Sequence, residues 1–159
     1  MPEAELDHLV VGCATLAQGA AWAETVLGAS PRPGGAHEGL GTHNLLLGFG
    51  PGLYLELIAP DPEQPPGAGP RMFGLDDPGV CARVAAAPRL LSFVARTAAL
   101  DTLLARIGPA GGTARPMARG GMCWRFAAPD GNPEGLLPAL IEWEGGHSAA
   151  ATLPDSSLR

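Results

Sequence analysis

The first part of the chain alternates a strand-like run with a helix-like run. Residues 6–13 (LDHLVVGC) are mostly apolar and rich in β-branched side chains, which predicts a strand. Thr15 and Gln18 then have the spacing of a capping box, and apolar side chains recur at helical intervals after them. Gly28 follows as the residue that ends this helix. The chain is therefore expected to begin with a strand and a helix.

Two further apolar runs predict a hairpin. Residues 43–49 (HNLLLGF) and 53–59 (LYLELIA) flank the turn-forming residues 50–52 (GPG), so we expect them to pair as antiparallel strands. Residues 32–38, where Pro and Gly are frequent, predict an irregular edge strand. Together these elements give the order βαβββ.

The same order begins again after a linker. Residues 60–70 (PDPEQPPGAGP) combine repeated Pro and Gly, the composition of a linker. After a short helix over residues 77–86, residues 90–96 (LLSFVAR) predict a strand. Residues 97–107 then predict a helix with one apolar face, ended by Gly108. A strand is again followed by a helix.

Three more strands complete the second series. They are expected at residues 113–117, at residues 122–128 after the turn Gly120-Gly121, and at residues 137–143 after a turn at residues 130–133. The repeat rests on the order and spacing of the elements. The sequence therefore predicts an α+β protein built from two βαβββ modules.

One domain over residues 1–150 is expected to hold both modules. Module one is expected at residues 5–60, the linker at residues 61–75 and module two at residues 76–146. The length of 159 residues is typical of a single domain. Residues 147–159 form a tail of small and polar side chains, expected either to be disordered or to reach a partner subunit.

Composition narrows the range of partners. The net charge of −6 offers no basic stripe for phosphates, so we expect a small-molecule ligand and no nucleic acid. All ten basic side chains are Arg, which excludes Schiff-base chemistry on a lysine. Cys13, Cys81 and Cys123 are widely spaced and predict free thiols. No apolar run has the length of a membrane span, and the first residues are unlike a signal peptide, so a cytoplasmic location is expected.

Several segments carry a family resemblance: LDHLVVGCATL, GTHNLLLGFG, YLELIAPDP, and RGGMCWRF with LIEW. They resemble bacterial glyoxalase-like domains of the vicinal oxygen chelate superfamily, which includes glyoxalase, bleomycin-resistance and dioxygenase proteins. The resemblance extends to about residue 150. It implies that the two modules form a curved mixed sheet around a cleft. It also implies a divalent metal held by the first and last strands of each module, and a homodimer.

Three ionisable side chains each lie within a largely apolar strand: His8, Glu56 and Glu142. A buried carboxylate without a partner costs on the order of several kcal/mol, so Glu56 and Glu142 call for a cation, a metal or solvent. By the resemblance, these three residues match ligands of a divalent Zn, Fe, Mn, Ni or Co ion, with Glu56 or Glu142 doubling as the catalytic base. Where a fourth ligand is expected, the chain has Ser92 and its apolar neighbours.

Each ligand also has a plainer interpretation. His8 is equally explained by hydrogen bonds of a strand histidine, and Glu56 by exposure to solvent. Glu142 is also explained by a cross-strand ion pair with Arg125 or Arg119.

Three residues are candidates for binding a substrate. His43 begins a strand and either caps the turn before it or faces the cleft. Arg125, like Arg119, suits a carboxylate or phosphate group, with ordinary surface charge as the alternative. Trp124 belongs either to the core or to the wall of the cleft. The remaining histidines, His37 and His147, are expected to be exposed.

Two functions follow from these residues. The first is a metal-dependent lyase, isomerase or dioxygenase acting on a small oxygenated molecule. The second is a metal-free protein that sequesters a small molecule, as bleomycin-resistance proteins do. A dimerisation or sensing module without chemistry is a third alternative. The glyoxalase reaction itself is not expected, since the pattern of four ligands is incomplete.

Overall fold

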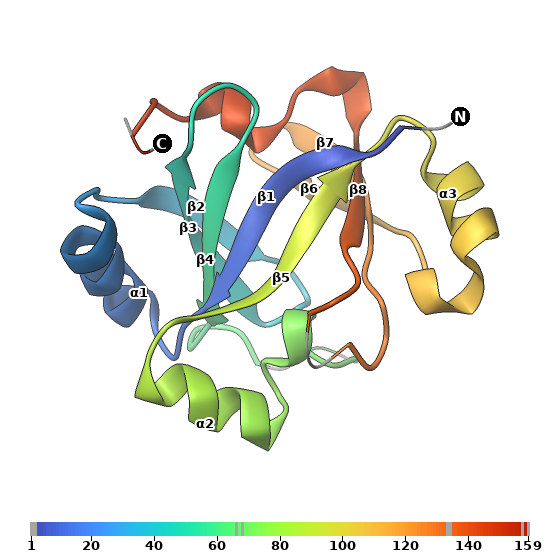
Figure 1. The fold of residues 1–159 in the computed structure, drawn as a ribbon. Helices are drawn as coiled ribbons and strands as arrows, with labels where there is room; N and C mark the ends of the chain where they lie inside the picture. Colours follow the sequence, from blue (N-terminus) through green and yellow to red (C-terminus); the bar gives the residue numbers. More distant parts are fainter. Residues whose placement is uncertain (1–2, 66, 68, 133–134, 157, 159) are drawn as a thin grey trace.

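The two predicted series of elements form one eight-stranded mixed sheet that curves strongly (Figure 1). The structure is a computed structural model and describes residues 3–65, 67, 69–132, 135–156 and 158. The strands are β1 (Glu5–Gly12), β2 (Arg32–His37), β3 (Thr42–Gly48), β4 (Tyr54–Pro60), β5 (Arg89–Arg96), β6 (Arg115–Arg119), β7 (Met122–Ala127) and β8 (Ala139–Trp143).

The strand order is β2-β3-β4-β1-β5-β8-β7-β6, and the two halves of the sheet repeat one pattern. In each half the first strand pairs in parallel with the fourth, as β1 with β4 and β5 with β8. The halves meet where β1 and β5 run antiparallel. This arrangement confirms the predicted α+β fold of two βαβββ modules in a curved mixed sheet.

Helices cover the outer face of the sheet. Helix α1 (Leu16–Trp22) continues as a π-helical turn over Ala23–Leu27 and packs against β3 and β4. The capping box forms as predicted, because Thr15 Oγ1 accepts a hydrogen bond from Gln18 N at 3.1 Å. Gly28 ends the helix with a φ of 69°, a left-handed conformation that favours glycine.

Two further helices belong to the second half of the chain. Helix α2 (Pro78–Ala86), capped by Asp77, closes one end of the inner core. Helix α3 (Leu100–Ile107) packs outside β8. It begins three residues later than predicted, because the Thr97 hydroxyl accepts a hydrogen bond from Ala99 N and forms a turn before the helix.

The predicted strand at residues 113–117 lies two residues further along, as β6. Gly120 and Gly121 both have positive φ values, so they form a two-residue hairpin turn. In such a hairpin the residues on either side of the turn pair with each other, and Arg119 pairs with Met122. The strand before the turn therefore extends to Arg119. Of the predicted turn at residues 130–133, Pro133 lies outside the described residues, as do residues 66 and 68 of the linker and residues 157 and 159 of the tail.

The described part of the tail packs on its own chain. Ala149 and Ala150 are buried in a cluster with Leu46 and Tyr54. Further on, Asp155 forms a bridge with Gly48 of β3. Within the described ranges, no helix has both the length and the apolar character needed to cross a membrane.

Two apolar layers follow from the curvature. The outer layer packs α1 on residues such as Val11, Leu55 and Leu57. The inner layer fills the curve of the sheet with side chains from both modules, among them Val10 and Trp124. Since side chains alternate between the two faces of a strand, every second residue of each strand points into the curve.

Candidate functional site

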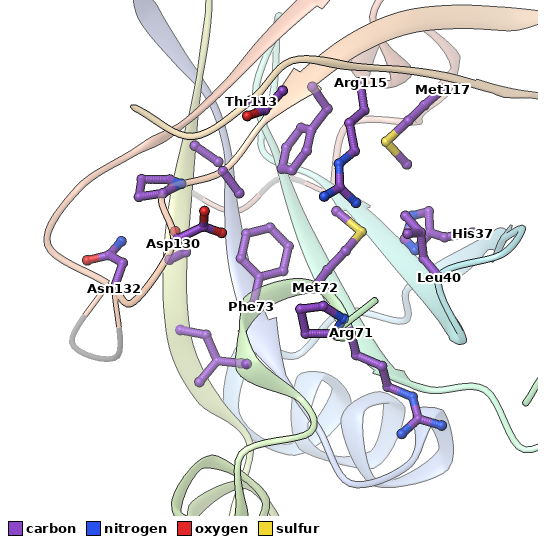
Figure 2. Close-up of a pocket in the computed structure, with 18 of the residues that line it drawn as sticks. His37, Leu40, Arg71, Met72, Phe73, Thr113, Arg115, Met117, Asp130 and Asn132 are labelled. Carbon is purple, nitrogen blue, oxygen red and sulfur yellow. The ribbon is translucent and has the colours of Figure 1, made fainter. Parts of the chain in front are cut away.

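A cavity of about 840 Å³ opens inside the curve of the sheet. Figure 2 shows side chains directed into it from several elements, including His37 at the end of β2 and Arg115 and Met117 on β6. Its walls combine polar side chains with apolar ones, among them Met72 and Phe73 from the segment before α2. A cavity of this size and character is suited to a small-molecule ligand.

A smaller chamber of about 30 Å³ adjoins this cavity. The two spaces share wall residues, among them Met117, Trp124 and Phe126. His8 and Glu56 line only the smaller chamber. The two ionisable groups therefore lie beside the ligand-sized cavity.

A β-bulge places two consecutive polar side chains in this interior. The pairing of β1 with β5 shifts between Leu6 and His8, which leaves Asp7 as the extra residue. Strand alternation would send Asp7 and His8 to opposite faces, but the bulge allows both to be buried in contact. Asp7 Oδ1 lies 2.7 Å from His8 Nδ1. Trp143 Nε1 donates a hydrogen bond to Asp7 Oδ2 at 3.0 Å.

His8 also faces Glu56 of β4. His8 Nε2 lies 3.5 Å from Glu56 Oε2, and both side chains are buried. The imidazole stacks on the ring of Tyr54 with the ring centroids 4.4 Å apart. Asn44 Nδ2 donates to the other carboxylate oxygen, Glu56 Oε1, at 2.5 Å. Each oxygen of the Glu56 carboxylate thus has a neighbour that stabilises its negative charge.

The pKa values of this pair move in opposite directions. Burial alone would lower the pKa of His8, but the hydrogen bonds and charges of Asp7 and Glu56 outweigh it and raise the pKa. Burial alone would raise the pKa of Glu56, but His8, His37 and Asn44 lower it to about 2. Both changes favour the charged forms, an imidazolium beside a carboxylate.

The hydrogen-bond network continues from Glu56 to the far edge of the sheet. Arg119 Nη1 lies 3.1 Å from Asn44 Oδ1 and 3.3 Å from His37 Nε2. His37 Nδ1 lies 2.9 Å from Thr42 Oγ1. Since Nε2 of His37 accepts from Arg119, its proton is assigned to Nδ1. Burial is the main cause of its lowered pKa, which agrees with a neutral ring.

The structure brings together only two of the three predicted metal ligands, His8 and Glu56. The predicted convergence of Glu142 with them is wrong, because Glu142 accepts hydrogen bonds from Leu100 N at 3.1 Å and Arg125 Nη1 at 3.2 Å. Its neighbours Ile141 and Trp143 line the chamber instead. Glu142 therefore faces α3, and the alternative of a pair with Arg125 is the one observed.

The predicted substrate contacts divide in the same way. Trp124 lines both the cavity and the chamber. Arg125 faces outward, where it pairs with Asp101 and Glu142. His43 is a quarter exposed, lies 3.8 Å from Asp61 and contributes to neither space. Arg125 and His43 thus point away from the cavity, and their sequence neighbours Trp124 and Asn44 point inward.

Several residues of the site were not predicted from the sequence: Asp7, Tyr54, Asn44 and His37. Asp7 was hidden by the bulge, which no local sequence pattern announces. His37 was expected to be exposed and is buried. The signal for His37 was available, because the short loop after it sets His37 opposite Thr42, with its side chain beside Asn44.

The positions of the second module equivalent to His8 and Glu56 hold other residues. His8 pairs with Val94 and Val10 pairs with Ser92, so the symmetry of the two antiparallel strands relates His8 to Ser92. Glu56 lies beside Val10, and Ala139 lies beside Val94. The residue equivalent to Glu56 is therefore Ala139.

A divalent metal does not fit the side chains that converge here. Glu142 faces away, and Ser92 and Ala139 occupy the equivalent positions of the second module. The lone pair of His37 Nε2 is engaged by the cationic Arg119. Across the described ranges, no group of three or more His, Cys, Asp or Glu side chains is arranged to hold a metal ion.

Comparison with known proteins agrees with the fold. A family model described as a glyoxalase-like domain matches residues 6–159. No curated protein matches the chain.

Solved structures of similar fold include enzymes that act on coenzyme A esters. Methylmalonyl-CoA epimerase from Mycobacterium tuberculosis is 23% identical with a TM-score of 0.56, over 86% of each chain. A variant of the Streptomyces coelicolor methylmalonyl-CoA epimerase, in complex with 2-nitronate-propionyl-CoA, is 19% identical with a TM-score of 0.59, over 91% of this chain and 97% of that one. A hypothetical protein from Bacillus halodurans C-125 is 14% identical with a TM-score of 0.62, over 92% and 99%. At these identities the likeness concerns the fold.

Proposed function

The chain belongs to the glyoxalase-like domain family, and from that premise we propose that it is an enzyme of isomerase or lyase type. In this proposal, His8 and Glu56 move a proton of a small oxygenated molecule. The observation that carries it is the buried ion pair of these residues, backed by Asp7, beside a cavity of about 840 Å³.

The fold itself does not require this pair. Ser92 and Ala139 hold the equivalent positions in the second module, and that half of the sheet forms without charges there. Burying charged groups costs free energy that well-packed apolar residues would not. Charges that are costly and unnecessary to the fold are best explained by chemistry.

The two groups have complementary roles. Glu56, as the carboxylate, accepts the proton when a C–H bond next to a carbonyl breaks. The electron pair of that bond moves toward the carbonyl oxygen, and the protonated His8 stabilises the negative charge there. Asp7 accepts a hydrogen bond from His8 Nδ1 and so orients the ring. Return of the proton at another position gives an isomer, and loss of a neighbouring leaving group gives a lyase product.

A ligand in the chamber would make Glu56 a stronger base. The low pKa of Glu56 depends on His8, whose Nε2 lies 3.5 Å from the carboxylate. A substrate that separates the two groups removes this stabilisation and leaves the carboxylate in a site with little water. Burial then raises the pKa of Glu56 toward the range of an effective base.

Sequestration of a small molecule is the second candidate function. The observation that favours it is the group of apolar side chains in the wall of the larger cavity, which includes Met72, Phe73, Met117 and Phe126. Methionine and aromatic side chains adapt to varied apolar ligands. In this case binding needs neither His8 nor Glu56 to exchange a proton.

One experiment separates the two functions. A panel of small 2-oxo acids and 2-hydroxy ketones is incubated with the protein in D₂O, and loss of the exchangeable C–H signals is followed by proton NMR. Wild type is compared with Glu56→Gln and His8→Gln, and Glu142→Gln is the matched control outside the chamber. Exchange that Glu142→Gln retains and Glu56→Gln loses is the expected result. If panel members bind without any exchange, sequestration replaces the proposal.

Two further expectations accompany the proposal. The homodimer expected from the resemblance is tested by the mass of the protein in solution. The cytoplasmic location expected from the composition is tested by cell fractionation.

A further inference from the structure

Arg119 spans the two ends of the curved sheet. It lies on β6, the last strand of the sheet order, and its guanidinium reaches His37 and Asn44 on the strands at the opposite end. Its stem crosses Gly35, where an added Cβ would lie 2.9 Å from Arg119 Cδ. Gly35 has a φ of 129°, so glycine is favoured at this crossing on both grounds. The Arg119 side chain is therefore held in place by Gly35, His37 and Asn44, which lie on the strands opposite its own.

The guanidinium has more donors than partners. Nη1 makes both of the contacts with Asn44 and His37. Nε is buried and has no hydrogen-bond partner among the residues that the structure describes. In the part of the chain that the structure describes, no ion pair joins Arg119 to a carboxylate. A cationic group that is mostly withdrawn from water and incompletely paired is an expected site for an anion.

This cation lies next to the proposed reacting groups. Arg119 lines the small chamber together with His8 and Glu56. Asn44 links it to Glu56, since the Asn44 amide accepts from Arg119 and donates to the carboxylate. The guanidinium carbon also lies 5.9 Å from the centre of the Trp124 ring, whose indole lines both spaces. A ligand that reaches Glu56 from the cavity therefore passes within reach of Arg119.

We propose that Arg119 binds the carboxylate of a small organic acid whose reactive C–H bond is presented to Glu56. The inference rests on the proposed function for the reaction, but the binding of the carboxylate stands without it. The substrate class is then a small carboxylic acid with an apolar body that fits against Met72, Phe73 and Phe126. Arginine binds a carboxylate through two N–H groups, which favours this group over a neutral isostere.

Binding of two matched pairs of probes tests the proposal: phenylacetate with phenylacetamide, and propionate with propionamide. Affinities are measured by calorimetry for wild type, Arg119→Met and Arg115→Met. Arg115 is the competing cation, since it lies on the same strand and lines only the larger cavity. We expect the wild type to prefer the carboxylate by at least about tenfold. Arg119→Met should lose that preference and Arg115→Met should keep it.

Several results would overturn the assignment. One is equal affinity of wild type for the acid and the amide in both pairs. The others are a preference for the acid that survives in Arg119→Met, and a preference for the acid that disappears in Arg115→Met. If Arg119→Met does not fold, Arg119→Lys is used, and its preference should fall below that of wild type because the fork of donors is lost. Binding through Arg119 without proton exchange would refute only the proposed function. Exchange without a preference for the acid would refute only the role of Arg119.

Discussion

Replacing Glu56 by Gln isolates the energetic value of the buried charge. Gln has nearly the same shape, and its carbonyl can still accept the hydrogen bond from Asn44, so the main loss is the negative charge facing His8. A pKa lowered from 4.5 to about 2 corresponds to about 3.5 kcal/mol of stabilisation at about 1.4 kcal/mol per pKa unit. We therefore expect Glu56→Gln to reduce the free energy of unfolding by about 3.5 kcal/mol at pH 7.

The sign of the pH dependence is fixed by the direction of this pKa change. The folded pKa of Glu56 lies below its usual value, so the unfolded chain binds more protons between pH 2 and pH 4.5. The stabilisation by Glu56 is therefore complete above about pH 4.5 and is lost as the pH falls toward 2. In Glu56→Gln this part of the acid dependence should be missing.

Urea unfolding followed by circular dichroism from pH 3 to pH 8 measures both effects. Glu142→Gln serves as the control, since it removes a carboxylate that faces α3 and is partly exposed. A loss below about 1 kcal/mol at pH 7, or an unchanged acid dependence in Glu56→Gln, would show that the ion pair is not formed as the distances indicate.

Three further predictions concern other parts of the molecule. His8→Gln should remove a stabilisation that is complete below about pH 6.5 and fades as the pH rises through the raised pKa of His8. Above about pH 6.5, the stability of the variant should therefore depend less on pH than that of wild type, as measured by thermal unfolding at several pH values. Trp143→Phe should lose about 1–3 kcal/mol because the buried Asp7 loses its indole donor, as measured by urea unfolding. Asp77→Ala should cost about 1 kcal/mol by leaving Val80 N without its cap in α2, as measured by urea unfolding.

The sequence predicted the architecture well because the architecture depends on local patterns. The apolar run at residues 53–59 became β4 (Tyr54–Pro60), and the capping box at Thr15 started α1 where expected. Turn residues with special backbone needs, such as Gly120 and Gly121, fixed the hairpins. Such signals lie within a few residues of the element that they specify.

The site was predicted less well because it depends on register and on distant pairing. One residue of register decides whether Glu142 or Ile141 points inward, and the apolar run containing both does not determine it. The bulge at Asp7 arises where β1 pairs with β5, and these two strands lie far apart in the sequence. His8 and Glu56 were found because each is an ionisable residue among apolar neighbours at alternate positions of a predicted strand.

The asymmetry of the two modules accounts for both parts of the site. At positions related by the symmetry of the sheet, the first module has the large ionisable residues His8 and Glu56, and the second has the small residues Ser92 and Ala139. Ser92 and Ala139 line the larger cavity, whereas His8 and Glu56 line only the small chamber. Small side chains in one half leave the space that a ligand needs, because the interior is otherwise close-packed. One half of the duplicated sheet thus supplies the proposed chemistry, and the other supplies room for the molecule on which it acts.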